Sequence, residues 1–290
     1  MSALGGLLGA AAASVPLIRL INSLCLEPFQ VPIEKRITPA RDWGSEILPG
    51  RSTDEISKGL PVGEGTERVR TVDGPILSAD VMSELVARAE ALESVAHRVN
   101  LPPHKQGATM DGPSLYERKE PFVDLYLSKE WQDMVSHVLG AKVEPITMSH
   151  PSTCSLLYYT QEGDHIAWHY DHNMFQGDYY TVLVPLVNEG ETDNGLSASR
   201  FCFRERHPFG LHALGVGKTH AVELPRNSMV AFEGPKLWHK AGKVKAGDRR
   251  IIWSMVYATS SKQLGYREVL RRIKDVSYIG LRALRRGKAI

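Results

Sequence analysis

From residue 143 onward the sequence breaks into short runs of β-branched and aromatic residues separated by turn residues, and this pattern limits the fold more than any other feature. The runs are KVEPITM, CSLLYYT, YYTVLVPLV, RFCFRE, HAVEL, SMVAFEG and RRIIWSMVYA. Many short strands without helices between them are typical of a sandwich or a barrel, and they argue against the alternating strands and helices of a βαβ sheet. We therefore expect a mainly β core with flanking helices, of the α+β class.

A helix is expected ahead of this core, in residues 77–99 (LSADVMSELVARAEALESVAHRV). Ser78 is a suitable N-cap, and Asp80 in the first turn complements the helix dipole. One face should pack on the core because its apolar positions recur at helical spacing. These positions are Val81, Leu85, Leu92 and Val95.

A second helix is expected in residues 128–140, with Ser128 as its N-cap and Gly140 as its stop. The residue pattern divides the whole chain into four regions. We expect an irregular N-terminal arm over 1–75, a helical support region over 76–142, the β core over 143–262 and a basic C-terminal helix over 263–290.

The composition is that of an ordinary globular protein of 290 residues with a net charge of +2, which gives no reason to expect nucleic acid as a partner. The three cysteines lack paired spacing, so we expect no disulfide framework and a reducing compartment, most simply the cytoplasm. The apolar segment 3–18 and the basic tail from Tyr266 leave membrane association or an organelle as alternatives.

Candidate metal ligands lie in the stretch GDHIAWHYDHN, residues 163–173. In a strand His169 and Asp171 project from the same face, so an imidazole nitrogen and a carboxylate oxygen could bind one metal ion. His172 would point away, while Asp164 and His165 are interpreted as loop residues. An HxD motif alone is a weak signal in a chain with 11 histidines.

A further histidine and two arginines strengthen this signal. His239 follows the run SMVAFEG, and Arg249 and Arg250 open the last predicted strand. Two histidines and one carboxylate with open coordination positions form the facial triad of non-haem Fe(II) oxygenases. A guanidinium group can bind a carboxylate in a bidentate geometry, which a dicarboxylate cosubstrate would need.

The segment from about Tyr158 to Tyr257 resembles the catalytic core of the 2-oxoglutarate/Fe(II)-dependent dioxygenases, particularly their prolyl-4-hydroxylase-like branch. The resemblance covers about a third of the chain and leaves out the N-terminal half and the basic tail. The first motif is YTQEGDHIAWHYD, with Tyr159, Gly163, His169 and Asp171 in the family positions. The second is HKAGKVKAGDRR, with His239, Val244, Gly247 and Arg249 in place.

The resemblance implies a double-stranded β-helix, or jelly roll, with N-terminal helices packed on the larger sheet. It implies that His169, Asp171 and His239 bind Fe(II) and that Tyr159 binds the cosubstrate. The family spacing favours Arg249 for the distal carboxylate. Arg250 shares a strand face with Ser254, however, so we favour Arg250 and keep both arginines.

The implied activity is oxidation of a C–H bond, with conversion of 2-oxoglutarate and O2 to succinate and CO2 and with ascorbate as an optional auxiliary reductant. Because related halogenases replace the carboxylate ligand by a small residue, Asp171 favours hydroxylation or desaturation, and of these we expect hydroxylation. The sequence identifies no substrate-binding residue, and we expect a small molecule as substrate. Two alternatives stay open: a metal-binding jelly roll without turnover, and a dioxygenase that modifies a protein side chain such as proline.

Overall fold

The structure is a computed structural model, and it describes residues 39, 41–53, 55–56, 60–61, 67–205 and 210–262. The apolar segment 3–18 and the basic tail from Tyr266, two features that the sequence singled out, lie outside this range. Within it, no helix is long and apolar enough to cross a membrane.

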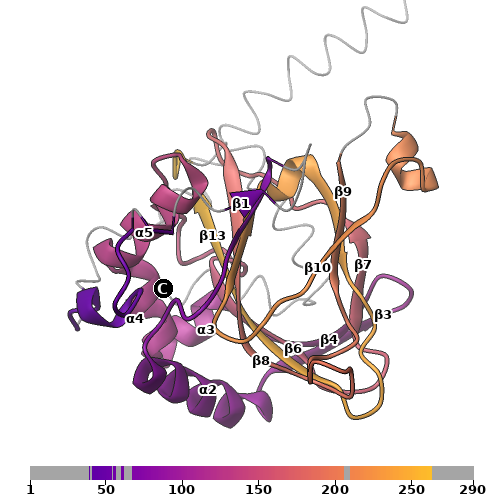
Figure 1. Cartoon of the computed structure of the whole chain (residues 1–290), viewed down its shortest axis with the longest axis horizontal. Helices are drawn as coiled ribbons and strands as arrows, with labels where there is room; N and C mark the ends of the chain where they lie inside the picture. Colours follow the sequence, from indigo (N-terminus) through magenta and orange to yellow (C-terminus); the bar gives the residue numbers. More distant parts are fainter. Residues whose placement is uncertain are drawn as a thin grey trace, which may run out of the picture.

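Thirteen strands of the described residues form one antiparallel sheet in the order β1-β2-β11-β8-β13-β6-β4-β7-β12-β9-β10, with β3 paired to β4 and β5 paired to β13. The sheet curls so that a smaller layer, made of β7, β12, β9 and β10, lies opposite a larger layer that contains β6, β13, β8 and β11 (Figure 1). The strands are β1 (Leu60–Pro61), β2 (Val69–Val72), β3 (His97–Leu101), β4 (Lys105–Met110), β5 (Glu144–Pro145), β6 (Cys154–Tyr159), β7 (His165–His169), β8 (Tyr179–Glu189), β9 (Phe201–Glu205), β10 (His220–Val222), β11 (Met229–Phe232), β12 (Leu237–Ala241) and β13 (Arg249–Ala258). The fold is the predicted jelly roll.

Strand β13 lies at the centre of the larger layer, between β6 and β8. Nearly all its residues are buried, because helices cover one face of the layer and the smaller layer of strands faces the other. Such two-sided burial explains why the run RRIIWSMVYA is almost continuously apolar after its two arginines. Each of the seven runs singled out in the sequence contains a strand.

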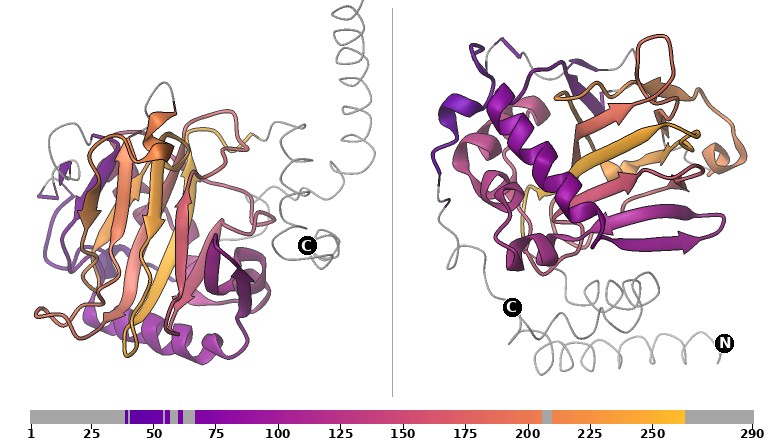
Figure 2. Two further views of the ribbon diagram at one scale, coloured as in Figure 1. Left: turned by 90° about the vertical axis from the view of Figure 1, so that its right-hand side faces the viewer. Right: turned by 90° about the horizontal axis from the view of Figure 1, so that it is seen from below.

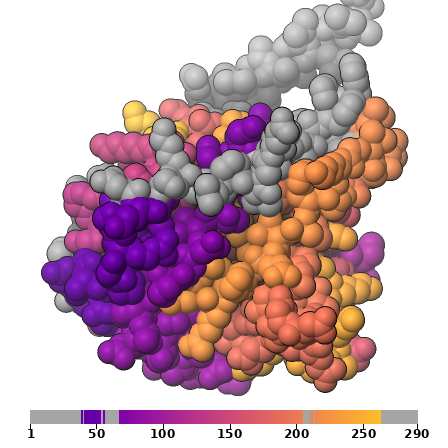
Figure 3. Space-filling model, in the orientation of Figure 1, coloured from indigo at the N-terminus to yellow at the C-terminus, as the bar shows by residue number. Residues whose placement is uncertain are grey.

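Four helices cover the outer face of the larger layer (Figure 2): α2 (Ala79–Glu93), α3 (Gly112–Glu117), α4 (Pro121–Leu127) and α5 (Lys129–Leu139). Helix α2 packs on β8, and α5 packs on β2 and β11. Both expected N-caps are present, since Ser78 accepts from the Val81 N–H and Ser128 from the Trp131 N–H. Gly140 ends α5 with a left-handed backbone (φ 65°), as the sequence indicated. In the space-filling view, strands of the smaller layer form the surface at the right (Figure 3).

The first helix is shorter than the sequence indicated. Helix α2 ends at Glu93, and residues 97–101 form β3 instead. Val95, which we expected on the buried face, is 54% exposed, whereas Val81, Leu85 and Leu92 are buried as expected. The turn after β3 contains Pro102 and Pro103, which cannot continue a helix, and pairing with β4 gives this segment a hairpin partner that no local pattern reveals.

Two regions contain strands that the sequence did not predict. The segment 1–75, expected to be an irregular arm, contains β2, which extends the larger layer by pairing with β11. The segment 76–142, expected to be helical, contributes β3 and β4 to the sheet. In both cases long-range strand pairing overrides weak local preferences.

A buried carboxylate fixes the start of β7. Asp164 is fully buried and accepts hydrogen bonds from the Arg98 guanidinium (2.5 Å) and from the backbone N–H groups of Thr160 (3.1 Å) and Gln161 (3.0 Å). Its own carbonyl accepts from the Val244 N–H (3.0 Å). These bonds join β3, the end of β6 and the loop after β12 at the point where β7 begins.

Replacing Asp164 by Ala should destabilise the fold by about 3 kcal/mol, because Arg98 loses its partner and the N–H groups of Thr160 and Gln161 lose their acceptor. The free energy of unfolding is measured from urea titrations of the two proteins. Lys129→Ala is the control, since it removes an exposed ion pair with Asp133 and should leave the unfolding midpoint unchanged. Equal midpoints for Asp164→Ala and the wild type would contradict a structural role for Asp164.

Candidate functional site

A cavity of about 560 Å³ lies between the two layers of the jelly roll and is lined by residues from both. His169, Asp171 and His239 line one part of it. Tyr159, Arg250 and Ser254 line another. The structure therefore brings six of the seven predicted site residues into one cavity, and Arg249 is the exception.

The two histidines are cross-strand neighbours. His169 at the end of β7 is directly opposite His239 on β12, and their ring centroids are 4.1 Å apart. Asp171 follows two residues beyond His169, with its Oδ1 3.7 Å from the His169 Nε2 and 3.8 Å from the His239 Nε2. Among the described residues these three form a group whose ligand atoms all lie within 4.8 Å of one another.

Hydrogen bonds orient all three side chains for metal binding. The Nδ1 atoms of His169 and His239 lie 2.8 and 2.9 Å from the carbonyls of Ala167 and Leu237. A carbonyl can only accept, so each Nδ1 carries a proton, and Nε2 is the nitrogen left to face the other ligands and coordinate a metal. Burial and the neighbouring His239 lower the pKa of His169 to about 3, so its imidazole is neutral and able to coordinate a metal near pH 7.

The carboxylate of Asp171 is held from its far side. Thr181 on β8 donates its hydroxyl to Oδ2 at 2.6 Å, which leaves Oδ1 directed toward the histidines. The backbone beside Asp171 belongs to Gly234, where a Cβ atom would lie 2.1 Å from Oδ2. Only glycine leaves room for the carboxylate here. Two imidazoles and one carboxylate on one side of a cavity fit a divalent transition metal with open coordination positions.

Arg250 supplies a buried positive charge in the same cavity. It is 2% exposed, and no ion pair of the described residues includes it. Its Nη1 donates to the Ser199 hydroxyl, while its Nε is buried without a hydrogen-bond partner. A buried guanidinium without an ion-pair partner is unfavourable, and an anion bound in this part of the cavity would compensate its charge.

The neighbours of Arg250 are polar on the cavity side. Tyr159 is opposite Arg250 in the ladder between β6 and β13, and its ring centroid is 5.7 Å from the guanidinium carbon. Burial raises the pKa of Tyr159 to about 12, so the phenol stays protonated and can donate a hydrogen bond. Ser254 lies on the same face of β13 as Arg250, four residues or two pleat repeats further along.

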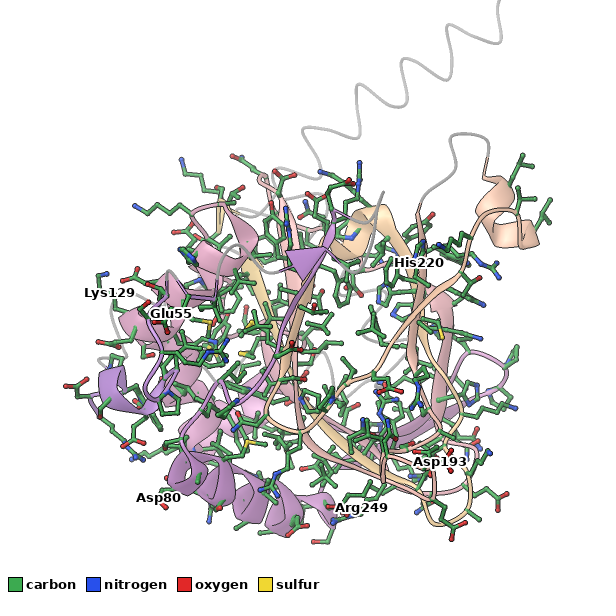
Figure 4. The ribbon with its side chains drawn as sticks, viewed as in Figure 1. Glu55, Asp80, Lys129, Asp193, His220 and Arg249 are labelled. Carbon is green, nitrogen blue, oxygen red and sulfur yellow. The ribbon has the colours of Figure 1, made fainter. Side chains whose placement is uncertain are left out.

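Arg249 points out of the cavity. Its guanidinium pairs with Glu90 (2.6 Å) and Glu93 (3.0 Å), so this side chain attaches β13 to α2 on the outer face of the sheet. Figure 4 labels it beside the C-terminal end of that helix. Of the two arginines kept open by the sequence, Arg250 is the one that lines the cavity.

Some cavity residues were not found by sequence reasoning. Thr181 carries no motif, although its position two residues into a predicted strand was visible. The β3–β4 hairpin was read as helical, yet Lys105 and Thr109 on β4 line the cavity. Lys105 and Thr109 are four residues apart in KQGATM, a spacing that puts both on one face when the segment is a strand.

The sequence favours Trp168, Trp238 and Trp253 as packing residues over a substrate platform, and the structure separates them. Trp253 is fully buried against Trp131, with 5.1 Å between ring centroids. Trp168 and Trp238 are only partly buried; their rings are near-parallel with centroids 6.4 Å apart, and the Arg204 guanidinium lies 4.6 Å from the Trp168 centroid. Both also line the cavity, so the packing interpretation describes Trp253 fully and these two in part.

Comparison with known proteins finds solved structures that are similar to this chain. No protein-family model and no curated protein matches the sequence. The non-haem α-ketoglutarate-dependent epimerase SnoN from nogalamycin biosynthesis superposes with a TM-score of 0.52 at 14% identity, covering 71% of this chain and 79% of that one. Its complex with Fe3+, α-ketoglutarate and nogalamycin RO gives the same score and identity, with 71% and 81% covered.

A prolyl hydroxylase from Trichoplax adhaerens, solved with a peptide fragment of the hypoxia-inducible factor oxygen degradation domain, also has a TM-score of 0.52. It is 13% identical, and the match covers 75% of this chain and 93% of that one. At these identities the likeness is one of fold. The chain has the jelly-roll fold of the 2-oxoglutarate/Fe(II) oxygenases, as the motifs predicted.

Substituting Thr181 by Val should lower the affinity for Fe(II) about 10–100-fold, because the Asp171 carboxylate loses the bond that fixes its orientation. Affinity is measured anaerobically by competition with a metal-binding dye. Thr181→Ser keeps the donor and should retain most of the affinity. If the valine variant binds Fe(II) as tightly as the wild type, Thr181 has no part in positioning the ligand.

Proposed function

We propose that this protein is a non-haem Fe(II)- and 2-oxoglutarate-dependent dioxygenase that oxidises a C–H bond of an organic substrate, with hydroxylation as the outcome and release of succinate and CO2. The observation that carries the proposal is the presence of two features in one cavity. One is the His169, Asp171 and His239 group, and the other is the buried Arg250 without an anionic partner.

In this proposal His169, Asp171 and His239 hold Fe(II) through two nitrogen atoms and one oxygen atom. Arg250 binds the distal carboxylate of 2-oxoglutarate, and Tyr159 and Ser254 add hydrogen-bond donors beside it. The iron and its cosubstrate supply the oxidation, in which O2 is consumed as 2-oxoglutarate is decarboxylated and the substrate C–H bond is oxidised.

The protein must also keep water from the metal. Phe201 and Phe232 contact His239, with ring centroids 5.7 and 4.8 Å from the imidazole. Both phenylalanines are buried and line the cavity. They form an apolar wall beside one ligand, which limits access of solvent to that side of the metal.

The alternative of a metal-binding jelly roll without turnover explains the histidines but gives no role to Arg250. A structural metal site requires no buried cation elsewhere in the same cavity. For this reason the dioxygenase is preferred. The similar structures include an epimerase and a hydroxylase solved with a peptide. Product analysis therefore decides whether the reaction is a hydroxylation. It also decides whether the substrate is a small molecule or a protein side chain. The scarcity of cysteine supports the cytoplasm as the compartment.

The proposal predicts that anaerobic addition of Fe(II) and 2-oxoglutarate to the apoprotein produces the weak visible charge-transfer band of a metal chelate. The band should be lost in His169→Ala, which lacks one ligand. Arg250→Met should raise the 2-oxoglutarate concentration at half-saturation about tenfold or more, because a charge-assisted hydrogen-bond pair is removed.

Arg249→Met is the matched control, since it removes the same charge from the neighbouring position but outside the cavity. It should leave the titration midpoint within about twofold of the wild type, because its ion pairs are with α2. Iron binding without a band would favour the metal-binding protein without turnover. Equal effects of the two arginine variants would show that the cosubstrate pocket is assigned incorrectly.

A further inference from the structure

A buried acid and a buried base lie two residues apart at the start of β13 without forming an ion pair. Asp248 directly precedes the strand and is 5% exposed, and Arg250 is 2% exposed. Burial lowers the pKa of the Arg250 guanidinium, and the neighbouring Tyr159 and Asp248 act in the opposite direction, so the two charges lie within electrostatic reach. In the described part of the chain no ion pair joins them, and each side chain makes its hydrogen bonds to other groups.

The Asp248 carboxylate is held by the β8–β9 loop, residues 190–200. Its Oδ2 accepts from the Ser197 hydroxyl at 2.9 Å and from the Ala198 N–H at 3.1 Å. The Lys245 N–H, in the turn before β13, donates to the same oxygen at 3.0 Å. Three donors on one oxygen satisfy a carboxylate and fix its direction. Asp248 is therefore directed toward the loop instead of toward Arg250.

The loop packs closely around this carboxylate. A Cβ atom at Gly190 would lie 2.2 Å from the Asp248 Oδ1 and 2.7 Å from the Ser197 Cα, so only glycine leaves room for the contact. The Gly190 N–H donates to the Gly195 carbonyl at 3.0 Å, which closes the loop on itself. The Ser197 carbonyl accepts from the Arg200 Nη1 at 2.7 Å, and the Ser197 side chain is fully buried. The position of the Ser197 hydroxyl is thus fixed from several sides.

The same loop contacts Arg250 two residues further on. The Ser199 hydroxyl accepts from the Arg250 Nη1 and donates to the Gly242 carbonyl at 2.6 Å. Its one proton goes to that carbonyl, so a lone pair faces the guanidinium. The Ser199 N–H in turn donates to the Ser197 Oγ at 3.1 Å. Ser197 therefore joins the two charged residues, because it donates to Asp248 and accepts from the residue that holds Arg250.

We propose that Ser197 is a positioning residue that keeps the Asp248 carboxylate away from Arg250, so that the guanidinium stays open to a carboxylate of 2-oxoglutarate. This inference rests on the proposed dioxygenase function. Without the Ser197 hydroxyl, Asp248 loses one of the three donors on Oδ2 and turns to the buried cation beside it. The internal ion pair then competes with the cosubstrate, whose apparent affinity falls with the fraction of protein in which Arg250 is unpaired.

The test is an anaerobic titration of the Fe(II)-loaded protein with 2-oxoglutarate, followed by the chelate band. Ser197→Ala should raise the concentration at half-saturation about five- to tenfold, the effect of losing a hydrogen bond to a charged group. Its affinity for Fe(II) should equal that of the wild type, because the three metal ligands are unchanged. Ser228→Ala is the matched control, since it removes an equally buried hydroxyl from the turn before β11, where it donates to the Pro225 carbonyl.

A double variant separates this role from a merely structural one. Asp248→Asn removes the competing charge, so the midpoint of Ser197→Ala/Asp248→Asn should return to within about twofold of the wild type. If Ser197 only supports the loop, the loss of a second hydrogen-bonding group should weaken cosubstrate binding further. An unchanged midpoint in Ser197→Ala, or a double variant that binds more weakly than the single one, would overturn the inference.

Asp248→Asn alone gives a second measurement if Ser197→Ala does not fold. Its midpoint should lie at or below that of the wild type, because no internal anion remains to compete, and a raised midpoint would show that the carboxylate itself supports the pocket. Failure of the proposed function gives a different result, since the wild type then shows no chelate band. In that case calorimetric titration of the metal-free protein with glutarate, a dicarboxylate without the keto group, still ranks the variants by the openness of Arg250.

Discussion

The register between β7 and β12 is the constraint on which the site depends. It puts His169 directly opposite His239, and a shift by one residue would turn one imidazole to the outer face of the layer. Neither strand sets this register alone. Strand β12 is also paired with β9, and β7 with β4. The start of β7 is fixed by the buried carboxylate of Asp164. The close approach of the candidate metal ligands is therefore a consequence of how the smaller layer is assembled.

Positively charged side chains held by hydroxyl groups are the second feature of the cavity. Arg250 and Lys105 are positioned inside the fold by hydroxyl groups, since Ser199 accepts from Arg250 and Thr109 from Lys105. A hydroxyl group satisfies a donor without neutralising its charge. Arg250 has no ion pair among the described residues, whereas Arg249, one residue away, is paired with glutamates on α2. The alternation of side chains along β13 separates an arginine on the outer face of the sheet from one that lines the cavity.

Much of this site could be predicted from local patterns. The HxD spacing identified His169 and Asp171, and strand periodicity favoured Arg250 over Arg249 because it shares a face with Ser254. The residues that were missed act through long-range pairing. Thr181 reaches Asp171 from β8, which is separated from β7 by a loop, and Lys105 enters the cavity because β4 joins β6 to β7. Sequence periodicity reports which face a residue occupies but not which strand will lie beside it.

The sequence by itself determined a mainly β core of short strands, both helix caps and the metal-ligand candidates, because these depend on residue type and on spacings of a few positions. The jelly roll was implied by the family resemblance. The tertiary structure alone decided that residues 97–110 form a hairpin wall, that Arg249 lies outside the cavity and that Lys105 lies within it. The physical reason is that strand pairing is non-local. A short segment such as 97–101 has little intrinsic preference, and its conformation is selected by the hydrogen bonds and burial that its neighbours provide.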